Sequence, residues 1–418
     1  MTTTSEPHRP APEQSAPTGP GADRPAGNSD TFVFWLIVLL APVGQMAIDI
    51  FVPSLPTLVD EFDTSRGAIQ LSVSLYLVAF AAGQLLYGPL ADARGRKAAL
   101  LTGVGLYLVG SVLTLVADSV ALFVTARIVQ GLGITAASVL MKVIPADRFS
   151  GPKLTQVMTW MVISWGLGPI LAPVIGAWFE MGPGWRYSLY FLTGYGLLLF
   201  ALIAFVFKET HHDRQPFSLR SLAADARSVM TDAEFTRLYL CMGLCFAVLL
   251  TFNLVGPFLV QDVMGYSAGV YGLIALAMGA AYFSGTFSNR VLPASFTTRR
   301  KFRTASLVTV LASVAMVVTA ALTPPNLWSL TLPSLVIVFF TGMMYPNLMA
   351  AGISRFPHVA GLVSSLLGCS LMLISGLVTI GSSLLKADTL LPVALLFTGC
   401  MVICRILLLR TLASRQEG

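Results

Sequence analysis

Long runs of apolar residues alternate with short polar stretches along almost the whole chain. The apolar runs are mostly about 20 residues long or longer, which is the length an α-helix needs to cross a bilayer. The pattern therefore predicts twelve membrane-spanning helices, with boundaries good to a few residues. These spans cover residues 32–55, 68–90, 98–117, 120–141, 155–179, 186–207, 235–260, 267–290, 304–322, 327–351, 359–384 and 390–411.

The polar stretches divide the chain into two sets of six spans. Residues 1–30 hold six prolines among small and polar residues, which predicts a disordered cytoplasmic tail. They lack the pattern of a secretory signal peptide. The longest internal polar stretch, residues 208–234, predicts a cytoplasmic linker between one six-helix bundle at 31–207 and another at 235–412. Within this linker, Ser218–Met230 can form a surface helix.

Composition and charge distribution agree with a polytopic membrane protein. Hydrophobic residues make up 55% of the 418 residues and charged residues only 11%, whereas soluble domains have about a quarter charged residues. The formal net charge of +6 does not indicate nucleic-acid binding, because the cations lie in loops. These basic residues gather after spans 2, 4, 8 and 10 and at the chain end, so the positive-inside rule predicts that both termini are cytoplasmic.

One acid, Asp49, is predicted to lie inside a span. A charged side chain there costs about 2.5–3.5 kcal/mol even on lenient insertion scales, so it is treated as functional by default. The alternative is a helix-end residue at the outer interface, because Pro53 and Pro56 follow shortly after it. We favour the functional interpretation.

One cation, Arg127, is predicted to lie inside a span as well. Arg127 and Gln130 share a helix face, and Gly131 and Gly133 allow close helix contact. Counted from the outer ends of their spans, Asp49 and Arg127 both lie roughly 10 Å deep. They can therefore share a cavity and a proton-dependent ion pair, although a static structural pair is the alternative. The residues proposed to line a substrate cavity near them are Gln45, Tyr76, Gln130, Asn253 and Asn347.

Two further stretches are candidates for conformational change. The short basic loop between spans 2 and 3 contains Gly88, Asp92, Arg94, Gly95 and Arg96. Its glycines are expected where helix ends approach closely, and Asp92 is expected near the positive end of a neighbouring helix. The fifth span carries Gly168, Pro169, Pro173 and Gly176 in a run of small residues and helix breakers, which favours a kinked helix with a smooth face on which a neighbour can pivot.

The second half contains a weak internal repeat and five cysteines. Gly285–Arg290 echoes the Gly88–Ala93 segment at the corresponding place, which suggests two pseudosymmetric bundles around a midplane site. The cysteines include two pairs spaced four apart, which could suggest a metal site. No histidine lies in those helices, so small apolar packing is favoured and no metal is predicted. The cysteines are Cys241, Cys245, Cys369, Cys400 and Cys404.

The order Gly-x-Leu-Ala-Asp-x-Arg-Gly-Arg-Lys at residues 88–97 resembles the signature loop of the major facilitator superfamily. Arg-x-x-Gln-Gly-x-Gly at 127–133 is similar to its proton-coupling motif, and the run at 166–177 to its antiporter motif. Asp49-x-x-x-Pro-x-x-Pro, together with segments 346–347 and 356–368, resembles the Bcr/CflA-type drug/proton antiporters. Two positions depart from the pattern: Ala93 replaces the usual arginine, and Ala146 replaces the basic residue before Asp147.

The resemblance implies an all-α membrane protein with twelve helices in two pseudosymmetric bundles, located in the bacterial cytoplasmic membrane. It also implies that Asp49 carries the proton and that Arg127 tunes it. The function favoured is proton-coupled export of small organic molecules. A dedicated exporter of an endogenous metabolite, such as a siderophore, is the alternative transporter. The expected partners are the substrate, protons and lipid, with no nucleic acid, no cofactor and a monomeric chain.

The sequence disfavours two classes of protein other than transporters. An enzyme is disfavoured because the sequence has no His-Glu-x-x-His or Gly-x-Ser-x-Gly motif, and its four histidines lie outside the spans. A membrane sensor or scaffold would not need a lone acid and a lone arginine at matched depth.

Overall fold

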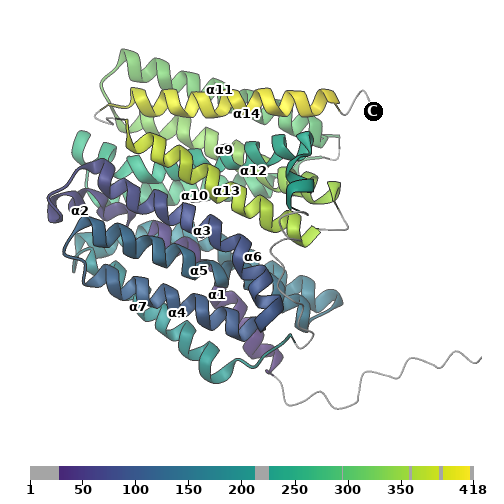
Figure 1. Ribbon diagram of the computed structural model, residues 1–418. Helices are drawn as coiled ribbons and strands as arrows, with labels where there is room; N and C mark the ends of the chain where they lie inside the picture. Colours follow the sequence, from purple (N-terminus) through teal and green to yellow (C-terminus); the bar gives the residue numbers. More distant parts are fainter. Residues whose placement is uncertain (1–27, 212–225, 294, 357–359, 386–388, 415–418) are drawn as a thin grey trace, which may run out of the picture.

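A computed structural model describes residues 28–211, 226–293, 295–356, 360–385 and 389–414. This part of the chain is built from helices, and no strand occurs in it. Twelve of its helical segments are long and apolar enough to cross a membrane, which confirms the twelve predicted spans. In Figure 1 the helices of the first half, in purple to teal, lie below those of the second half, in green to yellow.

The first half contains six spans. The first span consists of α1 (Asp30–Asp49), the short 3₁₀ helix η1 (Val52–Ser54) and α2 (Leu55–Glu61). The others are α3 (Arg66–Arg94), α4 (Arg96–Leu115), α5 (Val120–Arg148), α6 (Gly151–Met181), and α7 (Arg186–Ala201) continued by η2 (Leu202–Val206).

The second half contains the other six spans. The seventh is α9 (Ala233–Pro257) continued by η3 (Phe258–Val263). The others are α10 (Ala268–Val291), α11 (Thr298–Leu322), α12 (Leu327–Arg355), α13 (Ala360–Ser383) and α14 (Leu391–Ser414).

Polar residues at the loop ends start several of these helices. The Ser65 and Ser119 side chains each accept a hydrogen bond from a backbone N–H in the first turn of α3 and α5. Asp232 caps α9 in the same way. Asn326 and Ser329 form a reciprocal capping box at α12. The caps satisfy N–H groups that have no partner inside the helix, so the loops fix where the apolar runs begin.

Contacts between the two halves run mainly along two pairs of helices. α3 packs along α13, and α6 packs along α10. The span formed by α9 and η3 is the most enclosed of the twelve, whereas α6, α7 and α11 leave much of their surface outside. Large apolar side chains on that outer surface include Trp160, Phe205 and Leu311. Apolar residues that point outward over whole helices suit contact with lipid.

The structure lengthens the first predicted span, and two other predicted segments lie mostly outside the described residues. The first span was expected to end near residue 55, but helix continues to Glu61 after a break. Most of the predicted tail and most of Ser218–Met230 lie outside the described residues, although 226–230 is helical. The exact domain boundaries stay a prediction.

Candidate functional site

Asp49 is the last residue of α1 and lies at a break in the first span. The helix stops at Asp49 and resumes as η1, whose Pro53 has no N–H to donate to a continuous helix. The span then continues for twelve residues to Glu61, or about 18 Å at helical rise. Asp49 is fully buried. It is therefore an interior residue of the protein, although it lies at a helix end as the alternative expected.

Both carboxylate oxygens of Asp49 accept a hydrogen bond from a side-chain amide. Gln45 Nε2, one turn earlier in α1, lies 2.8 Å from Oδ2. Asn253 Nδ2, on α9 of the second half, lies 2.9 Å from Oδ1. An amide N–H₂ donates to an ionised carboxylate without neutralising it. The acid thus sits where the two halves meet, with one donor from each.

Arg127 lies beside the same part of α1 but does not pair with Asp49 in this structure. Its Nη1 donates to Gln130 Oε1 at 2.7 Å, and its Nη2 donates to the carbonyl oxygen of Ala47 at 2.8 Å. The guanidinium carbon lies 4.4 Å from the ring centroid of Phe51 and 4.3 Å from that of Tyr76. Such cation–π contacts stabilise a cation that has been removed from water.

Further hydrogen bonds fix the polar groups around Arg127. Gln130 Nε2 donates to Ser111 Oγ at 2.9 Å. The Tyr76 hydroxyl donates to the carbonyl oxygen of Gly44 at 3.0 Å. Gln130 and Tyr76 are both fully buried. Together these contacts attach α3, α4 and α5 to the backbone of α1 just before the break.

Four of the five residues predicted to line the cavity come together here, namely Gln45, Tyr76, Gln130 and Asn253. The structure places Asn347 elsewhere: its Nδ2 donates to Asn289 Oδ1 at 2.8 Å. Lys301 Nζ donates to the same oxygen at 3.0 Å. Asn347 therefore belongs to the α10–α11–α12 corner, where the internal repeat was found.

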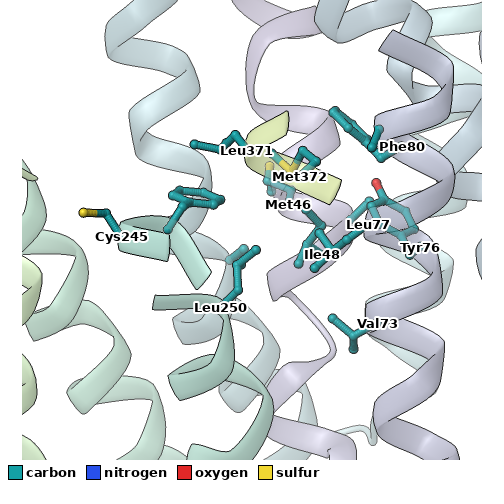
Figure 2. Close-up of a cluster of buried hydrophobic side chains, with 14 of the residues drawn as sticks. Met46, Ile48, Val73, Tyr76, Leu77, Phe80, Cys245, Leu250, Leu371 and Met372 are labelled. Carbon is teal, nitrogen blue, oxygen red and sulfur yellow. The ribbon is translucent and has the colours of Figure 1, made fainter. Parts of the chain in front are cut away.

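Apolar side chains from both halves also pack together where the halves meet. They form one buried cluster that includes Met46 of α1, Phe80 of α3, Leu250 of α9 and Met372 of α13. Figure 2 shows these residues, with the Tyr76 hydroxyl close to Phe80. Methionine thioethers are flexible and fit apolar surfaces of different shape.

The loop between α3 and α4 is held by ion pairs. Arg96, only 5% exposed, pairs with Asp92 and also with Asp147, to which its Nε lies 2.9 Å. Asp147 therefore makes a charge contact although Ala146 precedes it. Gly95 has a backbone φ of 98°, a conformation that favours glycine. Arg94 is exposed.

Glu209, which follows the sixth span, makes contacts with the start of α4 that were not predicted from the sequence. Its carboxylate accepts hydrogen bonds from the backbone N–H groups of Arg96 at 2.8 Å and Lys97 at 3.1 Å. An anion at this position suits the positive N-terminal end of α4. Gly88 was expected at a close helix contact, and that expectation is wrong because a Cβ there would meet no atom within 4 Å.

The small residues of α6 face two neighbours, one in each half. A Cβ on Gly176 would collide with the carbonyl oxygen of Ile50, and one on Gly168 would press on Pro42 of α1. On the other side, Gly272 of α10 contacts Ala177. Pro169 and Pro173 lie inside α6 and remove backbone donors there. α6 is thus packed closely between α1 and α10.

Additional polar contacts join the halves beyond the break. Gln261 Nε2 of η3 donates to the carbonyl oxygen of Pro53 at 2.8 Å. Arg66 at the start of α3 forms an ion pair with Asp262 at 3.0 Å. These contacts could not be predicted from the sequence, because helix rotation determines which loop residues meet.

Cys241 and Cys245 of α9 pack against Cys404 of α14. Cys245 Sγ and Cys404 Sγ lie 3.7 Å apart, and all five thiols are free and buried. Among the described residues, no group of three or more histidine, cysteine or acidic side chains is placed to hold a metal ion.

Comparison with a protein-family model decides the family. The model described as Major Facilitator Superfamily matches residues 34–380, which is most of the chain. The chain belongs to the major facilitator superfamily. The fold agrees, because a crystal structure of a D-xylose-proton symporter superposes with a TM-score of 0.70 at 14% identity. That match covers 90% of this chain and 97% of the symporter.

Curated relatives of this superfamily member share more sequence with it. Multidrug resistance protein D of Escherichia coli (strain K12) is 25% identical over 85% of this chain and 88% of its own length. The Bicyclomycin resistance protein homolog of Haemophilus influenzae (strain ATCC 51907 / DSM 11121 / KW20 / Rd) is 27% identical over 89% of this chain and 94% of its own length. These relatives confirm the resemblance to the Bcr/CflA type within the superfamily.

Proposed function

We propose that this superfamily member exports small organic molecules from the cell in exchange for protons, by alternating access. The observation that carries the proposal is Asp49: a fully buried acid at a helix break, bonded by amides from both halves. A proton or a substrate group that binds this carboxylate changes a contact between the halves. Movement of protons in one direction can then drive movement of substrate in the other.

The apolar side chains where the halves meet and the relatives support a substrate range of the multidrug type. Met46, Phe80 and Met372 offer adaptable apolar contacts and few directional ones. The relatives named above carry multidrug and bicyclomycin resistance in their names.

The same proposal covers the membrane topology, the oligomeric state and the driving force. Twelve spans put both ends of the chain on one side of the membrane, which is the cytoplasmic side if the basic loops follow the positive-inside rule. A single chain supplies both Gln45 and Asn253 to Asp49, so the site is complete in a monomer. Protons supply the driving force, and the cycle uses no cofactor.

Substrate-driven proton movement in proteoliposomes tests the proposal. Purified protein is reconstituted with a pH-sensitive dye inside the vesicles, and ethidium or bicyclomycin is added outside. Wild-type protein should couple movement of at least one compound to a change in internal pH. Asp49→Asn should abolish it, because the amide is close in size but does not titrate.

A matched control is Asp118→Asn, which changes an exposed acid in the loop between α4 and α5 and should behave as wild type. Proton movement of normal size in Asp49→Asn would overturn the role of that acid. A wild-type protein that responds to neither compound would contradict multidrug-type export.

A further inference from the structure

The hydrogen bond between Asp49 and Asn253 crosses from the first half of the molecule to the second. Asp49 lies on α1 and Asn253 on α9, and their side chains are 0% and 6% exposed. The donor Nδ2 and the acceptor Oδ1 are 2.9 Å apart. Whatever changes the charge of this carboxylate therefore acts directly on a contact between the halves.

We propose that Asn253 is the positioning residue through which the second half responds to the charge of Asp49. This inference rests on the proposed proton-coupled function. An ionised carboxylate only accepts hydrogen bonds, and it holds the Asn253 amide more firmly than a neutral acid does. The ionised acid thus keeps α9 against the break in α1. A proton, or a donor group of a substrate, weakens that contact and allows the halves to separate there.

The other titratable groups near the acid are attached to different atoms. Arg127 of α5 donates to the backbone of Ala47, and the Tyr76 hydroxyl of α3 donates to the backbone of Gly44. The Tyr271 hydroxyl of α10 lies 3.4 Å from the backbone oxygen of Asn253. From α6, Gly168 and Gly176 pack against the same stretch of α1 and bring no charge.

Charges farther along the joint are satisfied separately. Arg66 of α3 and Asp262 of η3 pair with each other at 3.0 Å. Of the groups around Asp49, the Asn253 side chain is the donor that reaches a carboxylate oxygen from the second half.

A second amide contact between the same two spans provides an internal control. Gln261 Nε2 donates to the carbonyl oxygen of Pro53 at 2.8 Å, four residues beyond the acid. Donor type and length resemble those of the Asn253 contact, but a backbone carbonyl does not titrate. Loss of the Gln261 contact should loosen the joint equally at every pH, whereas loss of the Asn253 contact should remove its response to pH.

The experiment measures the joint directly in the full-length protein without substrate. Spin labels are attached at Asp118→Cys and Ser267→Cys, which are exposed positions on the two halves at the end of the molecule beyond the break. The five native cysteines are replaced by serine or alanine. Label distances are measured in lipid nanodiscs over a range of pH. In the labelled parent, acidification should raise the ratio of separated to joined molecules about tenfold, the difference between a charged and a neutral acceptor.

Four variants in the labelled parent complete the test. Asp49→Asn and Asn253→Leu should both abolish the pH response. Gln261→Leu should increase separation but keep the response. Asn253→Asp, which keeps size and shape, should reverse its sign, because two adjacent carboxylates attract when they share a proton and repel when both are ionised. The reversal is a result that a merely structural asparagine would not give.

A normal pH response in Asn253→Leu, or an unreversed one in Asn253→Asp, would overturn the inference. Equal loss of the response in Gln261→Leu would overturn it too. The proposed function is tested separately. If the protein shows the predicted distances but moves no protons with substrate, the result supports the inference and contradicts the proposed export.

Discussion

Arg127 offers a sharp test of how the structure stabilises the break in α1. The sequence suggested an ion pair with Asp49, but the guanidinium instead bonds Gln130 and the backbone of Ala47. It also lies between the rings of Phe51 and Tyr76. Its role in this structure is therefore to hold α1, α3 and α5 together, and removing it should lower stability first.

The size of the effect follows from the groups that lose a partner. Arg127→Ala leaves two buried oxygens without their donor, at about 1–3 kcal/mol each. It also removes two cation–π contacts worth roughly 2 kcal/mol each when desolvated. Against this, the protein no longer buries a charge, which is a gain of several kcal/mol. The balance is a destabilisation of about 3–5 kcal/mol, in the range for truncating a large buried side chain.

The assay is thermal unfolding of purified protein in detergent, followed by tryptophan fluorescence. Arg127→Ala should unfold at a clearly lower temperature than wild type. Arg127→Lys should be intermediate, because an ammonium keeps the charge but lacks the planar donor fork. Arg290→Ala is the matched control, since Arg290 is exposed at the end of α10.

Equal unfolding temperatures for Arg127→Ala and Arg290→Ala would refute the reasoning. A strong alkaline shift of the transport optimum in Arg127→Ala without loss of stability would instead point to the direct pair with Asp49.

Three other predictions concern packing, the α3–α4 loop and pH. Gly176→Ala should lower the unfolding temperature, at a cost of about 1–3 kcal/mol, because the new methyl group meets backbone, while Gly88→Ala should be neutral. The Asp147 side chain is 18% exposed and that of Asp92 50%, and an exposed ion pair contributes less to stability. Asp147→Asn should therefore increase labelling of cysteines placed around the α3–α4 loop more than Asp92→Asn does. The hydrogen bond from Arg355, at the end of α12, lowers the pKa of Asp232. The ionised Asp232 therefore stabilises the fold at pH values above the usual carboxyl pKa, and this stabilisation is lost as the pH falls through the lowered pKa. Thermal unfolding from pH 7 to 3 should therefore show wild type and Asp232→Asn converging in acid, and a constant difference would contradict this.

The sequence was sufficient to predict the spans and the central acid. Twelve apolar runs of bilayer length leave little freedom in an all-helical membrane fold. Asp49 could be found because an acid inside such a run is costly and therefore rare. Arg127 was found for the same reason, and spacing along one helix placed Gln130 beside it.

Contacts that depend on helix rotation and on distant loops could not be predicted. Asn253 was expected near Asp49, but the hydrogen bond between these residues, 204 positions apart, was not, because hydropathy does not fix which face of α9 meets α1. Glu209 caps α4 from a loop more than a hundred residues away. Asn347 was predicted to lie near Asp49 but lies elsewhere for the same reason, because α10 and α11 determine what it touches.

The late arrival of Asn253 has a consequence for how the protein is made. A ribosome delivers the six spans of the first half to the membrane before the seventh, so Asp49 enters with Gln45 at hand but without its second donor. An acid in that situation is cheaper to insert when it carries a proton. We expect the newly inserted first half to hold Asp49 with one amide donor, and the second donor to arrive only when α9 docks. Biosynthesis would then end with the same event that each transport cycle repeats.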